Sequence, residues 1–247
     1  MIRVLLHGAN GAMGRAIARL LEDGIEGCAP GPMVSRGSHG FYASIADVKE
    51  PADLVMDFSF HTATQSALRY ASERGLPIVI GTTGHTEEEL ESIKKASECI
   101  PVFLSGNMSF GIAALCGLVR EAARLFPEAD IEIVETHHNR KADAPSGTAL
   151  MLGSAIKKER PEADIVCGRA GFSPRKRNEI GISSVRLGNI TGIHEVFIST
   201  GTETLTLKHE AHDRLLFAQG ALRAAAFLCG KQPGLYGMDD LLEGGVV

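Results

Sequence analysis

The sequence predicts an α/β fold, in which a doubly wound, Rossmann-type parallel sheet is joined to an inserted α+β domain with a mixed or antiparallel sheet. Three observations support this prediction. A strand pattern, a glycine-rich turn and a helix pattern open the chain. Strand and helix patterns then alternate to about residue 108, and strand patterns dominate from there to about residue 217. With 247 residues, 44% of them hydrophobic, the chain can bury an ordinary core in one or two domains.

The first turn has the composition of a dinucleotide-binding loop. The apolar run Ile2 to Leu6 predicts a strand, and Gly8, Gly11 and Gly14 follow it. In such a loop the glycines allow a sharp exit, a close approach to a pyrophosphate, and tight packing of the next helix, here Arg15 to Leu21. The GxxGxxG spacing departs from the commonest GxGxxG, so a purely structural turn is the alternative. The flanking strand and helix favour cofactor binding by Gly8, Ala9, Asn10, Gly11, Ala12 and Met13.

The end of the second strand bears on the choice of cofactor. A strand pattern at Pro32 to Ser35 is followed by Arg36, at the place where NAD-binding folds carry an acid for the ribose 2'-hydroxyl. A hydroxyl and a guanidinium suit a 2'-phosphate better, because arginine binds phosphate through two charge-assisted hydrogen bonds. We therefore predict that NADPH is favoured over NADH. If Arg36 only stacks on the adenine, NADH is also used.

Further strand patterns lie at Asp53 to Phe58, Pro77 to Ile80 and Val102 to Leu104, separated by helix patterns at Thr62 to Arg74 and from Thr86 to about Glu98. The carboxyl ends of parallel strands form the ligand crevice of such sheets. We therefore expect the polar exits of the later strands to contact the cofactor as well, through Gly81, Thr82, Thr83, Ser105, Gly106, Asn107 and Met108.

The segment from His137 to Thr148 carries the strongest chemical pattern. His137 and His138 are followed by Lys141 and by the turn-forming run Pro145-Ser146-Gly147-Thr148. Backbone N–H groups in such a turn can bind an acidic ligand, and imidazole can donate a proton near neutral pH. The pattern indicates a site for a small dianion that is protonated.

Two other interpretations of this segment stay open. The histidine pair can be surface decoration, and the turn can simply cap the helix predicted over Ala149 to Glu159. A metal site is the second, with His194, His209 and His212 downstream. Adjacent histidines diverge on a strand, however, and no HExxH or CxxC spacing occurs, so we expect no metal.

The second half of the chain is rich in strand patterns. A long helix pattern covers Ile112 to Phe126. Strands are predicted at Ile131 to Glu135, Ile180 to Leu187, Ile193 to Ser199 and Thr202 to His209, followed by a helix at Leu215 to Cys229 and a mixed tail at Leu235 to Leu242. We therefore divide the chain into a dinucleotide-binding domain (1–108), a substrate-binding and oligomerisation domain (109–217) and a return to the first domain (218–247).

Composition excludes several classes of partner. A net charge of −5 makes nucleic acid an unexpected partner, and the basic run Arg175-Lys176-Arg177 fits a solvated loop. No apolar stretch has the length of a membrane helix, and no leader pattern precedes the first strand. Five widely spaced cysteines form neither a disulfide framework nor a metal ribbon. We expect reduced thiols, a cytoplasmic location and no membrane partner.

The chain resembles the dihydrodipicolinate reductase (4-hydroxy-tetrahydrodipicolinate reductase) family of bacterial lysine and diaminopimelate biosynthesis nearly from end to end. The residues that carry the resemblance are Gly8 to Gly14, Asp57-Phe58-Ser59, Gly81 to Gly84, Asn107 to Gly111, Glu135 to Thr148, Arg186, Gly188, Gly192-Ile193-His194 and Gly234-Leu235-Tyr236. The longest of these motifs, Glu135 to Thr148, is also the most specific.

The resemblance implies an NAD(P)H-dependent reductase of 4-hydroxy-tetrahydrodipicolinate, which transfers a hydride to ring C4 and protonates the adjacent carbon to give tetrahydrodipicolinate. It implies that His137 is the proton donor and acceptor, Lys141 a second donor and His138 a substrate ligand. A substrate carboxylate would be held by Ser146, Gly147 and Thr148. The resemblance also implies a homotetramer assembled through the second domain.

Two departures from the family pattern concern the cofactor side. Ser35 stands where many members carry an acid, which puts strict NADH use in doubt, and Ser105-Gly106 replaces a more frequent Ala-Pro or Ser-Pro. Two rival functions also remain. A different two-domain dehydrogenase, such as one acting on an amino-acid semialdehyde, would require an activated cysteine. A nucleotide-sensing module without catalysis would require a recognition helix or a basic face.

Overall fold

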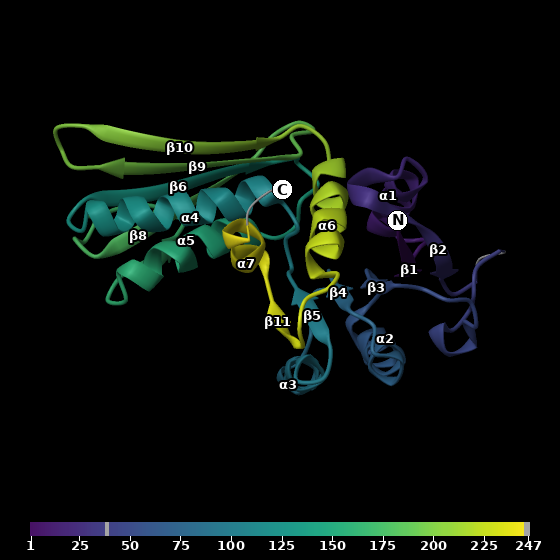
Figure 1. Cartoon of the computed structure of the whole chain (residues 1–247). Coiled ribbons are helices and arrows are strands. Elements are labelled where there is room, and N and C mark those ends of the chain that lie inside the picture. Colours follow the sequence, from purple (N-terminus) through teal and green to yellow (C-terminus); the bar gives the residue numbers. More distant parts are fainter. Residues whose placement is uncertain (38–39, 245–247) are drawn as a thin grey trace. The chain divides into compact units, whose positions relative to one another are not determined.

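The computed structural model describes residues 1–37 and 40–244 and separates the chain into two compact units (Figure 1). Unit 1 consists of Met1–Phe110 together with the segment from Leu215 onward, and unit 2 consists of Gly111–Arg214. The chain therefore leaves unit 1 once and returns to it once.

Unit 1 contains a six-stranded sheet in the order β11-β5-β4-β3-β1-β2, and every neighbouring pair is parallel. The strands are β1 (Ile2–His7), β2 (Cys28–Val34), β3 (Leu54–Asp57), β4 (Ile78–Ile80), β5 (Pro101–Leu104) and β11 (Gly234–Tyr236). The Rossmann-type parallel sheet predicted from the sequence is confirmed.

Helices cover both faces of this sheet, because strand side chains alternate between the two faces. On β1, Leu6 belongs to a core cluster with α1 and α6, whereas Leu5 belongs to a second cluster with α2 and α3. The helices are α1 (Ala12–Glu22), α2 (His61–Arg74), α3 (Glu87–Ser97), α6 (Leu215–Leu228) and α7 (Met238–Glu243), with short 3₁₀ turns η1 (Ile25–Gly27) and η2 (Ile45–Asp47).

The turn between β1 and α1 depends on two glycines. Gly8 has a φ of +91°, and a Cβ there would lie 2.4 Å from the carbonyl oxygen of Phe58. A Cβ on Gly14 would lie 2.2 Å from the carbonyl oxygen of Gly8. The amides of Gly8 and Ala9 both donate to the carbonyl of Val34, at 2.9 and 3.1 Å. Helix α1 is thereby held close against the ends of β1 and β2.

Unit 2 contains a five-stranded mixed sheet in the order β10-β9-β6-β8-β7, which confirms the mixed sheet predicted for this part of the chain. Its strands are β6 (Asp130–His137), β7 (Asp164–Cys167), β8 (Glu179–Arg186), β9 (Gly192–Ser199) and β10 (Thr204–Ala211). β6 is the central strand, parallel to β8 and antiparallel to β9. Helix α4 (Phe110–Leu125), which starts at the last residue of unit 1, and helix α5 (Gly147–Glu159) complete the core with Ile131, Ile133, Val196 and Ile198.

Several elements differ from the sequence-based expectation. Strand β2 begins at Cys28 rather than Pro32, and so includes Pro30 as well as Pro32. Both prolines can be accommodated because β2 is an edge strand, where a missing N–H donor leaves no neighbouring strand unpaired. Strand β7 was not predicted, since its four residues are partly exposed and carry little pattern. The mixed tail resolves into β11, which extends the sheet of unit 1, and the separate helix α7.

Close packing at Gly14 leads to a stability prediction. Gly14→Ala should lower the free energy of unfolding by about 1–3 kcal/mol, since the new methyl group meets backbone atoms that cannot move aside. Gly117→Ala in α4 is the matched control: nothing lies within 4 Å of a Cβ there, so helix propensity should stabilise the protein by about 0.5–1 kcal/mol. Urea unfolding of the three proteins measures both effects, and a loss of stability of equal size in both variants would contradict the packing argument.

Candidate active site

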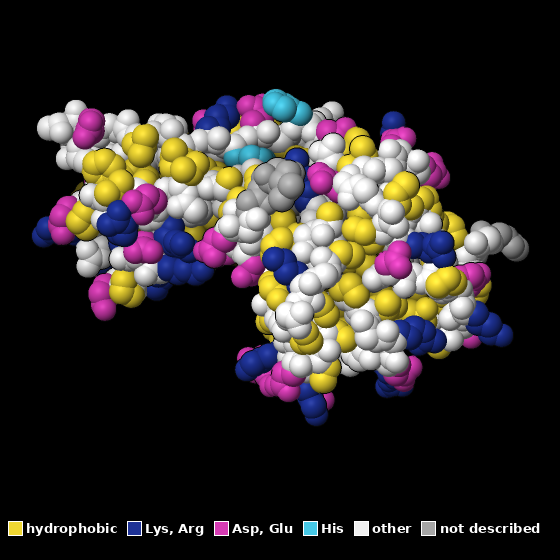
Figure 2. Space-filling view, viewed as in Figure 1, with side chains coloured by type: hydrophobic (Ala, Val, Ile, Leu, Met, Phe, Trp, Pro, Cys, Tyr) yellow, Lys and Arg dark blue, Asp and Glu magenta, His cyan; other side chains and the backbone are white. Residues whose placement is uncertain are grey.

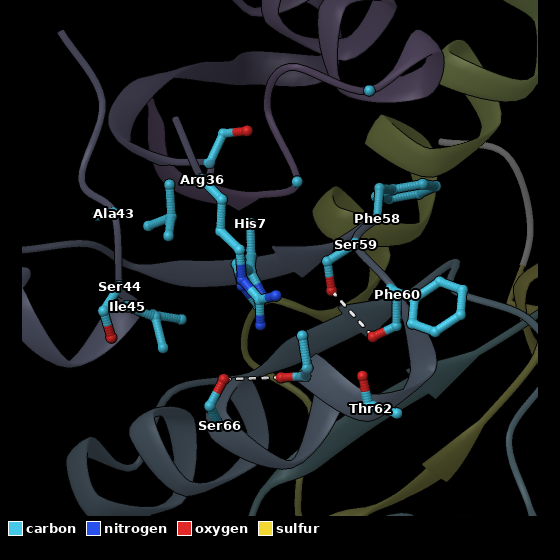
Figure 3. A pocket seen from close by; sticks show the side chains of 15 residues that line it. His7, Arg36, Ala43, Ser44, Ile45, Phe58, Ser59, Phe60, Thr62 and Ser66 are labelled. Carbon is cyan, nitrogen blue, oxygen red and sulfur yellow. Dashed lines mark hydrogen bonds between the residues drawn. The ribbon is translucent and has the colours of Figure 1, made fainter. Parts of the chain in front are cut away.

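A cavity of about 640 Å³ lies at the carboxyl ends of the strands of unit 1 (Figure 3). Of the cofactor residues predicted from the sequence, Gly8, Gly11, Ser35 and Arg36 line it. The opposite wall comes from the β3–α2 connection and the start of α2, and includes Phe58, Ser59, Phe60, Thr62 and Ser66. The size and the mixed apolar and hydroxyl lining fit the adenosine half of a dinucleotide.

Other predicted cofactor residues lie around this cavity rather than in its wall. Asn10 and Ala12 are exposed on the turn and at the first residue of α1. The side chains of Ala9 and Met108 are buried in the core of unit 1, so any contact from them to a cofactor is through the backbone. The side chain of Met13 packs against this core and is partly exposed.

The remaining predicted residues follow the next two strands of the sheet. Gly81, Thr82 and Thr83 follow β4, and Ser105, Gly106 and Asn107 follow β5. The Ser105 amide donates to the Ile80 carbonyl at 3.1 Å, and a Cβ on Gly106 would lie 3.3 Å from the Thr83 methyl group. The structure therefore places these two loops side by side at the same edge of the sheet as the cavity.

In unit 2 the predicted acid–base residue His137 belongs to a buried network. His137 is the last residue of the central strand β6, and its Nδ1 lies 2.5 Å from Oε2 of Glu135. Glu135 is fully buried. Arg186 donates to both of its carboxylate oxygens, at 2.9 and 2.8 Å, and the Ser146 amide donates to Oε1 at 3.1 Å.

These partners keep Glu135 charged. Burial alone would raise the pKa of its carboxyl group, but hydrogen bonds from Arg186, Ser184, His137 and the Ser146 amide outweigh burial and lower that pKa to about 2. A carboxylate can only accept hydrogen bonds, so the nitrogen 2.5 Å away must carry a proton. Nδ1 of His137 is therefore the protonated nitrogen, and Nε2 is left for exchange with a ligand.

The backbone of β9 approaches Nε2 of His137 at a glycine. A Cβ on Gly192, the first residue of β9, would lie 3.1 Å from Nε2 of His137. Any larger residue would thus crowd Nε2. Glycine at this position leaves room for a ligand against the imidazole.

A second imidazole lies beside the first. His194 is 4% exposed, and its ring meets that of His137 edge to face at a centroid distance of 5.2 Å. Burial, together with the neighbouring His137, lowers the pKa of His194 to about 4, so this ring is neutral at neutral pH. Nε2 of His194 is 3.1 Å from the Ser146 hydroxyl, which also accepts a hydrogen bond from the Ala149 amide as the cap of α5. Ser146 thus ties the start of α5 to both Glu135 and His194.

The other predicted substrate residues surround the start of α5. Nζ of Lys141 lies 2.8 Å from Oδ1 of Asp143, with the lysine side chain 21% exposed. His138 is half-buried, and its Nε2 lies 3.4 Å from a guanidinium nitrogen of Arg214. Burial, followed by the nearby guanidinium groups, lowers the pKa of His138. Gly147 and Thr148 are the first two residues of α5.

No local sequence pattern assigns a role to Glu135, Arg186 or His194. One feature could have indicated the first: Glu135 and His137 are two residues apart on a strand, and so face the same side of the sheet. Arg186 and His194 lie on neighbouring strands, opposite His137 and Glu135 respectively. Their approach depends on strand register, which the sequence does not display. In the described part of the chain, no three His, Cys, Asp or Glu side chains gather as metal ligands.

A Rossmann-type nucleotide unit combined with a second unit that carries an acid-supported imidazole defines an NAD(P)H-dependent oxidoreductase. The family models described as "Dihydrodipicolinate reductase, N-terminus" and "Dihydrodipicolinate reductase, C-terminus" match residues 2–108 and 111–242. The chain therefore belongs to the dihydrodipicolinate reductase family, as its resemblance to that family predicted.

Similar proteins agree with this assignment. The 4-hydroxy-tetrahydrodipicolinate reductase of Caldanaerobacter subterraneus subsp. tengcongensis is 47% identical, over 99% of this chain and 100% of that protein. The enzyme of the same name from Clostridium tetani is 42% identical, over 98% of each. Among solved structures, a dipicolinate-bound dihydrodipicolinate reductase from Paenisporosarcina sp. TG-14 superimposes with a TM-score of 0.80 at 22% identity, over 97% of this chain and 99% of that one. The last comparison shows a shared fold.

The neutral His194 leads to a prediction on stability and pH. In the unfolded chain this imidazole takes up a proton near its ordinary pKa of 6.5, whereas the folded protein resists protonation down to about pH 4. Protonation of His194 therefore favours the unfolded chain. The free energy of unfolding is unaffected by this group above pH 6.5 and should fall, by up to about 1.4 kcal/mol per pH unit, as the pH is lowered toward 4.

Urea unfolding between pH 7.5 and 4.5 measures this dependence in the wild type and in His194→Asn. The variant lacks the titrating group, so its free energy of unfolding should fall less steeply over this range. Equal slopes in the two proteins would show that His194 is not held neutral by the fold.

Proposed function

We propose that this protein reduces 4-hydroxy-tetrahydrodipicolinate to tetrahydrodipicolinate with NAD(P)H, in the route to diaminopimelate and lysine. The names of its full-length relatives support this activity. The observation that carries the mechanism is the buried Glu135–His137 pair, which supplies an oriented acid–base group linked to the start of α5 through the Ser146 amide.

The substrate is a ring with two carboxylates, and unit 2 offers matching cationic and N–H groups. We assign one carboxylate to the backbone amides of Gly147 and Thr148 at the start of α5, where the helix dipole favours an anion. Lys141 and His138 provide the cationic and imidazole contacts. Ser146 has a different part in this proposal, because its amide and hydroxyl already bond to Glu135, His194 and Ala149; it positions α5 and the two imidazoles.

His137 is the proton donor in this mechanism. With Nδ1 fixed on Glu135, the imidazolium presents Nε2–H to the substrate carbon next to the reduced one, and transfer of that proton leaves a neutral ring. The buried carboxylate stabilises the imidazolium before transfer. Lys141 stabilises the developing negative charge and serves as a second donor. The 4-hydroxyl group of the substrate must leave as water, which gives the unsaturated dihydrodipicolinate ring. When bound, the reduced dinucleotide would supply the hydride for C4 of that ring.

Unit 1 contains the groups needed to hold that dinucleotide. The amides of Gly8 and Ala9 are occupied by Val34, so we assign the pyrophosphate to the amides at the start of α1, around Ala12 and Met13. The cradle fits a pyrophosphate, since glycine at positions 8 and 14 lets the turn pack closely. Ser35 and Arg36 line the adenosine cavity, which supports a preference for NADPH, with NADH as a weaker cofactor.

Assembly into a homotetramer is part of the proposal. The face of the unit 2 sheet opposite α4 and α5 carries Val134, Val185, Ile193 and Phe197, which are only half-buried or exposed. These side chains share one face by strand register and would be covered by a second copy.

A cytoplasmic location is also proposed. None of the five cysteines forms a disulfide bond, which suits a reducing compartment. None of the described helices is long and apolar enough to cross a membrane.

The rival functions find less support. Burial raises the pKa of Cys28 to about 11 and also raises that of Cys229, so neither thiol suits a nucleophile for a semialdehyde. A nucleic-acid-binding regulator would be expected to present a basic face, whereas acidic and basic side chains are interspersed on the face shown in Figure 2.

Oxidation of NADPH in the presence of freshly formed 4-hydroxy-tetrahydrodipicolinate, followed by absorbance, tests this function. We expect substrate-dependent oxidation by the wild type and a kcat lower by roughly 10²- to 10⁴-fold in His137→Gln, the range for loss of a general acid. The Kd for NADPH should be nearly unchanged in that variant, since His137 belongs to unit 2. Tight NADPH binding without any oxidation by the wild type would exclude the reductase, and full activity of His137→Gln would exclude the proposed donor.

A further inference from the structure

The nucleotide cavity of unit 1 contains a histidine that the family resemblance does not assign to a function. His7 is the last residue of β1, directly before the glycine-rich turn, and its side chain lines the cavity together with that of Arg36 (Figure 3). Only 10% of the His7 side chain is exposed. The imidazole ring occupies space next to the proposed adenosine site, so it can influence which nucleotide binds there.

Behind His7 lies a fully buried carboxylate. Asp57, the last residue of the neighbouring strand β3, has its Oδ1 3.1 Å from Nδ1 of His7 and 2.5 Å from the Ser59 hydroxyl, which donates to it. The hydroxyl of Thr64 donates to Oδ2 at 2.7 Å. Burial alone would raise the pKa of Asp57, but His7, Ser59 and Thr64 together lower it, so the carboxylate is charged.

His7 separates this negative charge from the cavity. His7 and Ser59 line the cavity, whereas Asp57 does not and has no exposed surface. Nδ1 of His7, the atom closest to Asp57, is buried. The exposed part of the side chain is therefore a different part of the ring. The imidazole thus stands as a layer between the buried carboxylate and the space in which a nucleotide would bind.

We propose that His7 is a specificity-determining residue of the dinucleotide site: it screens Asp57 and thereby lets the site accept a phosphate on the adenosine ribose. This inference rests on the proposed use of NAD(P)H. An unscreened carboxylate near the cavity repels any nucleotide, and repels most strongly the one with an additional phosphate. Arg36 attracts that phosphate, and His7 separates it from the opposing charge of Asp57.

Dissociation constants for NADPH and NADH, measured by fluorescence titration of the full chain without substrate, test the proposal. His7→Ala exposes Asp57, so we expect the Kd for NADPH to rise roughly tenfold or more and that for NADH to change by less than about threefold, in keeping with the larger charge of NADPH. Replacing the carboxylate as well, in His7→Ala/Asp57→Asn, should return the NADPH-to-NADH ratio of dissociation constants to within about threefold of the wild type.

His61→Ala is the matched control. Nδ1 of His61 lies 2.9 Å from Oε2 of Glu89, so this substitution also removes a histidine from an acid–imidazole pair of unit 1. Neither His61 nor Glu89 lines the cavity. Its ratio of dissociation constants should equal that of the wild type. Should His7→Ala fail to fold, His7→Gln carries the test, because the glutamine amide can fill part of the space in front of Asp57. The NADPH-to-NADH ratio of dissociation constants should then shift in the same direction by a smaller factor.

The outcomes separate this proposal from the function on which it rests. A wild type that binds neither dinucleotide would overturn the proposed function itself. A wild type that binds both, together with His7 variants that leave the ratio unchanged or weaken both cofactors equally, would overturn the role of His7 alone. A double variant that fails to restore the ratio would show that Asp57 is not the charge being screened.

Discussion

The architecture of unit 2 depends on one buried carboxylate, that of Glu135. It receives hydrogen bonds from Arg186 on β8, from the amide of Ser146 at the start of α5, and from His137 two residues further along its own strand. A buried charge is tolerated only when its hydrogen-bonding capacity is filled, and removal of one partner of such a group typically costs about 3–5 kcal/mol. Burial of this carboxylate therefore requires that β6, the start of α5 and β8 come together.

The same interaction orients the proposed acid–base group. Because Glu135 holds Nδ1 of His137, we propose that the imidazole meets the substrate with Nε2, where Gly192 leaves space. Ser146 transmits the constraint to α5, whose first amides we propose as the carboxylate site. Unit 1 shows a related arrangement at Asp57 and His7, although there the imidazole covers the charge instead of exchanging a proton. In both units a buried acid at or near the end of a strand determines what an adjacent histidine can do.

Much of this organisation could be predicted from the sequence, and the rest could not for physical reasons. Glycines at positions 8 and 14 and the run from His137 to Thr148 are local patterns, so they indicated the nucleotide turn and the site segment directly. The partnership of Glu135 with Arg186 spans 51 residues and depends on the register between β6 and β8. The pairing of His7 with Asp57 likewise depends on the adjacency of β1 and β3. Ser146 was expected among the substrate ligands, and only the structure shows that its polar groups are engaged within the chain.

The central claim is that Glu135 holds His137 with its proton on Nδ1 and leaves Nε2 for exchange. ¹⁵N NMR of the histidine side chains, assigned by comparison with His137→Gln, reads the protonation of each ring nitrogen directly. At a pH at which the ring is neutral, we predict a protonated Nδ1 with a strongly hydrogen-bonded proton, and an unprotonated Nε2. A neutral His137 with its proton on Nε2, or the same spectrum after Glu135→Gln, would contradict the account.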